Sequence, residues 1–247
     1  MRKLVITSGK GGVGKTTVTA LLGRKLSLMG YKVVLVDGDV GLNNLDVVMG
    51  IENKVVYDIS DVIDGRCRLS QALVLDNETG VRVLPSSSRK LDVSPQAFRG
   101  VIDSIHADFV LVDCPAGLDE GFHRAVSSVA EAIVVTTPSA SAIRDADKVR
   151  GLLSSYHLSD TGLVVNRVRY DMIKRGEMLT PKEIGNLLHL GVMGVVPEDD
   201  HVTIFGQLGK VPDFAISERS GDILAENVVK STKNLVEPYM KKRWKWR

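Results

Sequence analysis

The chain has 247 residues, 44% hydrophobic and 25% charged, which are ordinary values for one large globular domain. Its net charge of +2 falls to −3 once the five basic side chains of residues 241–247 are set aside, which argues against a body that binds polyanions by charge alone. Two cysteines without a CxxC spacing exclude a disulfide framework and a zinc finger. The apolar run near the N-terminus is too short for a signal peptide, so we expect a cytoplasmic protein.

Short apolar runs rich in Val, Ile and Leu recur along the chain, with helical patterns between them. The runs do not alternate apolar and polar residues, which indicates strands buried on both faces. Strand alternating with helix predicts a doubly wound, mostly parallel α/β sheet flanked by helices, with ligands at the carboxyl ends of the strands. The predicted strands are 3–7, 32–37, 109–113, 132–136, 162–166 and 191–196, with 81–85 a weaker candidate; the predicted helices are 15–29, 92–105, 120–128, 141–155, 180–188 and 217–236.

The first predicted strand runs into TSGKGGVGKTT, in which Gly9 to Thr16 fit the phosphate-loop pattern G-x-x-x-x-G-K-[ST]. Such a loop turns its backbone N–H groups toward a phosphate and adds the positive end of the following helix. Lys15 should reach the β- and γ-phosphates, and the Thr16 hydroxyl should ligate Mg²⁺. The alternative, a chance match in a glycine-rich turn, is disfavoured by the strand before it and the helix after it. The predicted nucleotide contacts are Gly11, Gly12, Val13, Gly14, Lys15, Thr16 and Thr17.

Two further strand ends carry carboxylates. Asp37 and Asp39 follow one buried strand, and Asp113 ends another. Acidic groups beside a phosphate loop suit Mg²⁺, its bound water and the orientation of an attacking water. Asp113 fits the Walker B aspartate, and the N–H of Gly117 in the next loop could sense the γ-phosphate. The alternative for Asp37 and Asp39 is a polar turn after a strand.

The predicted strand 162–166 ends at Asn166, whose amide could both donate to and accept from the edge of an adenine ring. The N/T-K-x-D run typical of guanine recognition is absent from the sequence. We therefore expect ATP or ADP with Mg²⁺ rather than GTP.

Residues 238–247, PYMKKRWKWR, form a basic and aromatic tail that follows a domain expected over residues 1–237. Tryptophans favour the membrane interface, and each cation near an anionic surface contributes about 1 kcal/mol. We expect this tail to bind anionic lipids. A solvated tail or a nucleic-acid contact is the alternative.

The run KGGVGKTT resembles the deviant Walker A motif of the MinD/ParA family of ATPases. The segments NLDVVMG, VVYDISDVIDG, LSQALV, RGEML and VVPED extend the resemblance, toward the MinD branch, over nearly the whole chain. It implies that Lys10 crosses a dimer interface to the partner's nucleotide and that Asp39 positions the attacking water. Asp37 would lie near Mg²⁺ or its waters. The implied base contacts are Asn166, Arg167 packed on the ring, and Pro197 in the segment that lines the pocket.

The resemblance further implies an ATPase that dimerises with ATP, associates with the inner face of the cell membrane and regulates placement of the division site. The implied partners are a MinC-like division inhibitor and a MinE-like or other topological regulator, whereas nucleic acid is not expected. Four alternatives stay open: a MinD-like regulator of flagellar number, a ParA-type partition ATPase, an iron–sulfur protein of the nitrogenase iron-protein type, and a non-catalytic nucleotide-binding protein.

Overall fold

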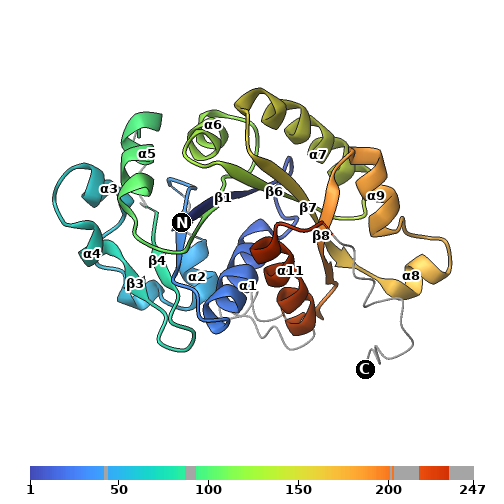
Figure 1. Ribbon diagram of the computed structural model, residues 1–247, viewed down its shortest axis with the longest axis horizontal. Coiled ribbons are helices and arrows are strands. Elements are labelled where there is room, and N and C mark those ends of the chain that lie inside the picture. The colour runs from blue at the N-terminus through green and yellow to red at the C-terminus, as the bar shows by residue number, and fades with distance from the viewer. Residues whose placement is uncertain (42–43, 87–92, 201, 203–216, 234–247) are drawn as a thin grey trace.

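The computed structural model describes residues 1–41, 44–86, 93–200, 202 and 217–233, which form an α/β fold around one central sheet (Figure 1). Within these residues the sheet has eight strands in the order β3-β4-β2-β5-β1-β6-β7-β8. Every neighbouring pair is parallel except β3 with β4. The strands are β1 (Arg2–Thr7), β2 (Val33–Asp37), β3 (Val74–Leu75), β4 (Arg82–Leu84), β5 (Phe109–Asp113), β6 (Glu131–Thr136), β7 (Asp160–Val168) and β8 (Gly191–Pro197). The predicted fold class is confirmed.

Helices cover both faces of the sheet. One face packs against α1 (Lys15–Leu28), α2 (Leu45–Met49) and α11 (Glu218–Lys230). The other packs against α5 (Pro95–Ser104), α6 (Glu120–Ser127), α7 (Ala140–Leu153) and α9 (Pro181–Leu188) (Figure 1). Shorter helical segments are the 3₁₀ turns at Glu52–Lys54 and Ser154–Tyr156, α3 (Ile59–Ile63), α4 (Leu69–Ala72) and α8 (Tyr170–Lys174).

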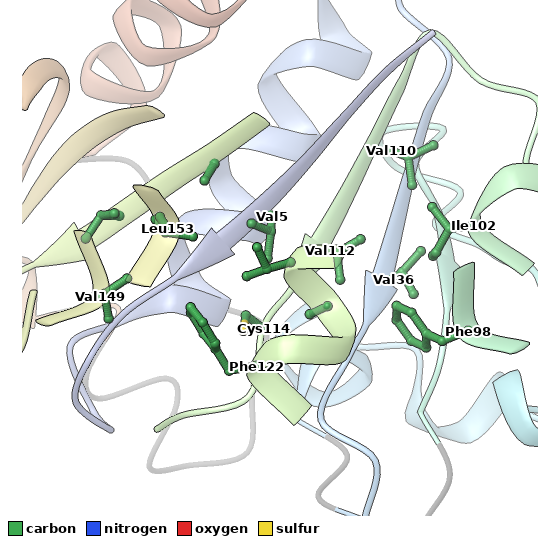
Figure 2. Close-up of a cluster of buried hydrophobic side chains, with 14 of the residues drawn as sticks. Val5, Val36, Phe98, Ile102, Val110, Val112, Cys114, Phe122, Val149 and Leu153 are labelled. Carbon is green, nitrogen blue, oxygen red and sulfur yellow. The ribbon is translucent and has the colours of Figure 1, made fainter. Parts of the chain in front are cut away.

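The central strands have no polar face because helices cover both of their sides. Every residue of β2 and of β5 is buried, as the unbroken apolar runs predict. Figure 2 shows Phe98 of α5 and Phe122 of α6 against the valines of β1, β2 and β5. Fully burying an aromatic or aliphatic side chain of this size contributes about 1.5–3 kcal/mol. This packing holds the carboxyl ends of β1, β2 and β5 at one edge of the sheet.

Helix α11 ends earlier than the predicted range 217–236. Its last residue is Lys230, and Ser231 is left-handed with φ of 50°. The N–H of Thr232 then donates to the Asn227 carbonyl at 2.9 Å, a hydrogen bond that closes the helix end. The sequence analysis expected the helix to continue to residue 236, because a serine is not one of the residues that usually mark a helix end.

Several short elements between residues 45 and 75, and α8, were not predicted. They are five residues or fewer, so they hold too little hydrophobic periodicity to be recognised. A local signal did exist for α3, where Asp58 and Asp61 form a reciprocal capping box.

The predicted tail 238–247 lies outside the described residues, as does the loop predicted at 206–212. Among the described residues, no helix has the length and apolar character needed to cross a bilayer.

Candidate active site

The phosphate loop joins β1 to α1, and two glycines shape it. Gly12 and Gly14 have φ of 77° and 93°, a conformation that other residues adopt only with strain. Gly14 is the cap of α1, and its carbonyl accepts from the Val18 N–H at 2.9 Å. Gly11 and Gly12 are exposed, Val13 is buried, and Thr17 is half-buried on the first turn of the helix. The N-terminus of a helix of three or more turns therefore faces the loop, as an anion site requires.

Helix α7 supports the start of the loop. A Cβ placed on Gly9 would lie 2.1 Å from the backbone oxygen of Asp145, so only glycine fits there. The exposed Lys10 extends along the same helix, and its ammonium donates to the Ser141 hydroxyl at 3.1 Å. Helix α7 therefore lies directly against the start of the phosphate loop.

The Thr16 hydroxyl and the Asp113 carboxylate join the loop to the end of β5. Thr16 Oγ1 donates to Asp113 Oδ2 at 2.6 Å, and Thr19 Oγ1 lies 3.3 Å from Asp113 Oδ1. Burial raises the pKa of Asp113 to about 6, although the charge of Lys15 and the two threonine hydroxyls oppose this shift. The Lys15 side chain is itself buried, so the loop holds a cation and a carboxylate with little exposure to water.

Asp37 organises the backbone that follows β2. Its Oδ1 accepts from the Asp39 N–H at 3.0 Å, and its Oδ2 accepts from the N–H groups of Asn44 and Leu45 at 3.3 and 3.2 Å. Burial, followed by the charge of Asp113, raises the pKa of Asp37 to about 8. The carboxylate thus fixes the turn in this structure, and its role near Mg²⁺ stays a prediction.

Asp39 is half-buried, and its backbone is held more firmly than its side chain. The Asp39 carbonyl accepts from the Ser86 hydroxyl at 2.8 Å. Burial raises the pKa of its carboxyl, and the charge of Lys15 opposes that rise. The role of Asp39 in positioning the attacking water stays a prediction.

The predicted base contacts lie at a bulge in β7. The register with β8 shifts between Val165 and Val168, and Arg167 has φ of 58°. Asn166 consequently turns inward and is buried, and its Nδ2 donates to the Val13 carbonyl at 2.8 Å. Arg167 points to solvent, whereas Pro197 is the buried last residue of β8 and pairs with Val168. The structure thus brings Asn166 to the phosphate loop and leaves Arg167 exposed.

Two further residues of the site, Gly117 and Cys114, lie in the loop after β5. Gly117 has φ of 100°, so its backbone takes a shape that only glycine adopts without strain. Cys114 is buried, and burial raises the pKa of its thiol to about 12. A thiol with that pKa is a poor nucleophile at neutral pH, as expected of a buried packing residue.

Sequence reasoning missed two contacts of this site. Thr19 lies one helical turn after Thr16, so the i, i+3 spacing could have placed both hydroxyls on the side that faces Asp113. Arg124 of α6 donates to the Gly38 carbonyl at 3.5 Å, and no sequence signal links these distant positions.

The donor set fits a magnesium nucleotide. Mg²⁺ usually keeps several waters and takes one or two protein oxygens plus phosphate oxygens. Thr16 retains acceptor capacity on its hydroxyl oxygen while it donates to Asp113. In the described part of the chain no group of three or more His, Cys, Asp or Glu side chains could hold a metal by itself, which is consistent with an ion held mainly by phosphate and water.

Comparisons with known proteins agree with this geometry. Residues 4–210 match the family model for the CobQ/CobB/MinD/ParA nucleotide binding domain. The chain is 46% identical over 206 residues to the septum site-determining protein MinD of Bacillus subtilis, covering 81% of this chain and 77% of that protein. It is 45% identical over 215 residues to a putative septum site-determining protein MinD of Oltmannsiellopsis viridis, covering 85% of this chain and 68% of that protein.

Solved structures are similar along almost their whole length. The MinC:MinD cell division protein complex of Aquifex aeolicus matches with a TM-score of 0.85 and 37% identity over 93% of this chain and 96% of that chain. The cell division ATPase MinD of Pyrococcus furiosus matches with a TM-score of 0.83 and 32% identity, covering 94% and 99%. MinD of Pyrococcus horikoshii, solved with Mg-ADP, matches with a TM-score of 0.81 and 32% identity. The match covers 95% of this chain and 99% of that chain. The chain therefore belongs to the CobQ/CobB/MinD/ParA nucleotide-binding family and, within it, to the septum site-determining MinD ATPases.

Proposed function

We propose that the loop from Gly9 to Thr16 binds Mg-ATP and that Lys15 neutralises charge on the β- and γ-phosphates. The observation that carries this proposal is the 2.6 Å hydrogen bond between Thr16 and Asp113, beside the buried Lys15. Thr16 would ligate the ion directly, and Asp113 would hold one of its waters. When bound, Mg²⁺ supplies positive charge to the phosphate oxygens and favours the ionised form of nearby carboxyls.

Asp39 would orient the attacking water, and Lys10 would act on the nucleotide of a second copy of the chain. Lys10 is exposed and makes a hydrogen bond to a neutral hydroxyl, Ser141, rather than an ion pair. An exposed contact of this kind contributes little, so the side chain can leave it at small cost. Delivery of the cation in trans would tie hydrolysis to dimerisation, because phosphoryl transfer depends on electrostatic stabilisation. The backbone N–H of Gly117 would donate a hydrogen bond to the γ-phosphate and so distinguish ATP from ADP.

Asn166 would contact the adenine ring with its carbonyl oxygen, since its Nδ2 already donates to the Val13 carbonyl. That oxygen can accept from the exocyclic amine of adenine, which guanine lacks at the same position. Pro197 would line the pocket, and Arg167 would have to turn from solvent to pack on the ring.

The ATP dimer would be the membrane-bound form. The described chain ends at Lys233, which pairs with Asp160 at the first residue of β7. Lys233 therefore lies at the amino end of β7, whereas the phosphate loop follows the carboxyl end of β1. One short tail binds a membrane marginally, whereas two tails in one dimer bind by avidity. We propose a peripheral location on the inner face of the cell membrane and a domain boundary near residue 237.

The division inhibitor would be a MinC-like protein, which the MinC:MinD complex of Aquifex aeolicus supports by analogy. A MinE-like or other topological regulator would stimulate hydrolysis and release. A partition role would need a basic body, and the chain without its seven-residue end carries −3. An iron–sulfur role would need cysteines that bridge a dimer, and Cys114 is buried in the core.

The test is a vesicle pelleting assay on the full chain with ATP, ADP or no nucleotide, run beside phosphate release and duplex DNA binding. We expect phosphate release that requires Mg²⁺, and pelleting with anionic vesicles that requires ATP. Retardation of DNA with ATP, in a protein that ignores vesicles, would support the partition role instead. Pelleting that does not depend on nucleotide would contradict the dimer switch.

A further inference from the structure

Arg124 lies on α6 with its guanidinium under the turn that carries Asp39. Its Nη2 is 3.5 Å from the Gly38 carbonyl oxygen, and its Nη1 is 3.4 Å from the Val93 carbonyl oxygen. The guanidinium also stacks on Phe98, with the Cζ atom 5.7 Å from the ring centroid. Figure 2 shows that Phe98 lies in the core beside Val36 of β2, so the base of this arrangement is rigid.

The Gly38 carbonyl belongs to the peptide group whose N–H is that of Asp39. This N–H donates to Asp37 Oδ1 at 3.0 Å, while the carbonyl end faces Arg124. Because a peptide group is planar, two contacts at its opposite ends restrict its rotation. The Val40 N–H also donates to the same Gly38 oxygen at 3.2 Å, which closes a tight turn around Asp39. Arg124 therefore restrains the plane from which Asp39 projects.

Helix α6 is joined to the loop that follows Asp113. A Cβ on Gly121, in the first turn of α6, would lie 2.7 Å from Pro115 Cγ, so the helix sits directly on that loop. A Cβ on Gly38 would likewise lie 2.7 Å from the Asp113 carbonyl oxygen. If the loop after β5 shifts, α6 should shift with it because the two are in direct contact. The Arg124 guanidinium would then move relative to the turn at Gly38.

Among the residues that the structure describes, one donor of Arg124 has no hydrogen-bond partner. Its Nε is buried and makes no hydrogen bond to any residue that the structure describes. A buried donor that makes no hydrogen bond is unfavourable, because it has lost its contact with water without gaining another. An apolar side chain could cover Phe98 without burying an unsatisfied donor. We therefore infer that the guanidinium at this position does more than stabilise the fold.

We propose that Arg124 is a positioning residue for Asp39, which holds the Gly38–Asp39 peptide from the helix that follows the Asp113 loop. The inference rests on the proposed role of Asp39 in orienting water. The contacts of Arg124 described above are with Gly38, Val93 and Phe98, and none of these residues belongs to the phosphate loop. Replacing Arg124 should therefore lower the turnover rate and leave the affinity for nucleotide unchanged.

The test is a double-mutant cycle in the full chain with Arg124→Met and Asp39→Ala, read by kcat and KM for ATP and by equilibrium ADP binding. Methionine keeps an unbranched apolar side chain as far as the position of Nε but removes the donors of the guanidinium. We expect kcat to fall about tenfold, the low end of effects from a misplaced catalytic group. ADP affinity should stay within about twofold. In the Asp39→Ala background the same change should add nothing, because residues that act as one unit are non-additive.

The matched control is Arg99→Met on α5, whose exposed arginine pairs with Asp103 and should leave kcat unchanged. Arg124→Lys should give an intermediate kcat, since an ammonium cannot reach two carbonyls as a guanidinium does. If Arg124→Met does not fold, the Lys variant serves in the cycle. A kcat equal to wild type, or an effect that adds fully to Asp39→Ala, would overturn the proposal. An unaffected kcat in Asp39→Ala alone would instead refute the role proposed for Asp39.

Discussion

Asp37 and Asp113 occupy paired positions on the adjacent parallel strands β2 and β5, so two buried carboxyls meet at the carboxyl edge of the sheet. Burial raises the pKa of Asp113 to about 6, and burial together with Asp113 raises the pKa of Asp37 to about 8. Both values lie above that of an unfolded aspartate, about 3.9. At neutral pH the proton is therefore held on Asp37, whereas Asp113 is mostly ionised, and a bound cation would favour the ionised form of both carboxyls.

This arrangement predicts how stability depends on pH. A raised folded-state pKa contributes stability that is present below about pH 4 and lost as pH rises through about 6 for Asp113 and about 8 for Asp37. Asp113→Asn should therefore raise the urea midpoint of the nucleotide-free protein, and by more at pH 8 than at pH 5. The exposed Asp147→Asn serves as control. An equal increment at both pH values would contradict the burial argument.

The two lysines of the loop should separate binding from turnover. Lys15→Ala removes the main partner of the phosphate charge and should abolish ATP binding. Lys10→Ala should bind ATP but neither dimerise nor turn it over, because the exposed Lys10 acts on the second copy. Equilibrium binding, sedimentation and phosphate release measure these properties. If Lys10→Ala dimerises and hydrolyses ATP like wild type, the trans role is wrong.

Asp39→Ala should bind ATP, accumulate as a dimer and hydrolyse slowly. We expect a loss of roughly 10²-fold in turnover, the usual scale for a positioned acid or base. The measurement is phosphate release at saturating ATP with anionic vesicles present. An unchanged rate would reduce Asp39 to a residue of the turn that Asp37 organises.

Gly9→Ala should damage the site through α7. The new Cβ would lie 2.1 Å from the Asp145 backbone oxygen, and overpacking of this kind costs typically 1–3 kcal/mol. We expect a lower unfolding midpoint and weaker ADP binding. Gly100→Ala on the exposed face of α5 meets no atom within 4 Å and should instead stabilise by about 0.5–1 kcal/mol. Equal effects of the two variants would mean that the loop does not depend on its contact with α7.

The tail should carry membrane binding. Deletion of residues 238–247 should abolish pelleting with anionic vesicles and leave ATP binding intact. Replacing Trp244 and Trp246 by Ala should weaken pelleting even at low salt, whereas salt should weaken only the contribution of the cations, with a Debye length near 10 Å at about 0.1 M. If the truncated protein still pellets in an ATP-dependent way, the anchor lies elsewhere.

The sequence alone determined the phosphate loop and the strands of the described sheet other than β3. Unbroken apolar runs such as 109–113 predict strands buried on both faces, and the structure places β5 at Phe109–Asp113. The loop pattern is local, so its glycines and Lys15 can be read from a few consecutive letters. The ends of elements were harder to predict, because a single left-handed residue, Ser231, ends α11 at Lys230 and not at the predicted residue 236.

Only the tertiary structure decided which of these residues meet. Asp37 turned out to bind three backbone N–H groups, Asn166 turned inward because β7 bulges, and Arg124 reached Gly38 across 86 positions of sequence. Such contacts join parallel strands and the helices between them, whose separation along the chain hides their distance in space. Local periodicity specifies what each segment is, whereas the packing of segments onto one sheet specifies which side chains share a site.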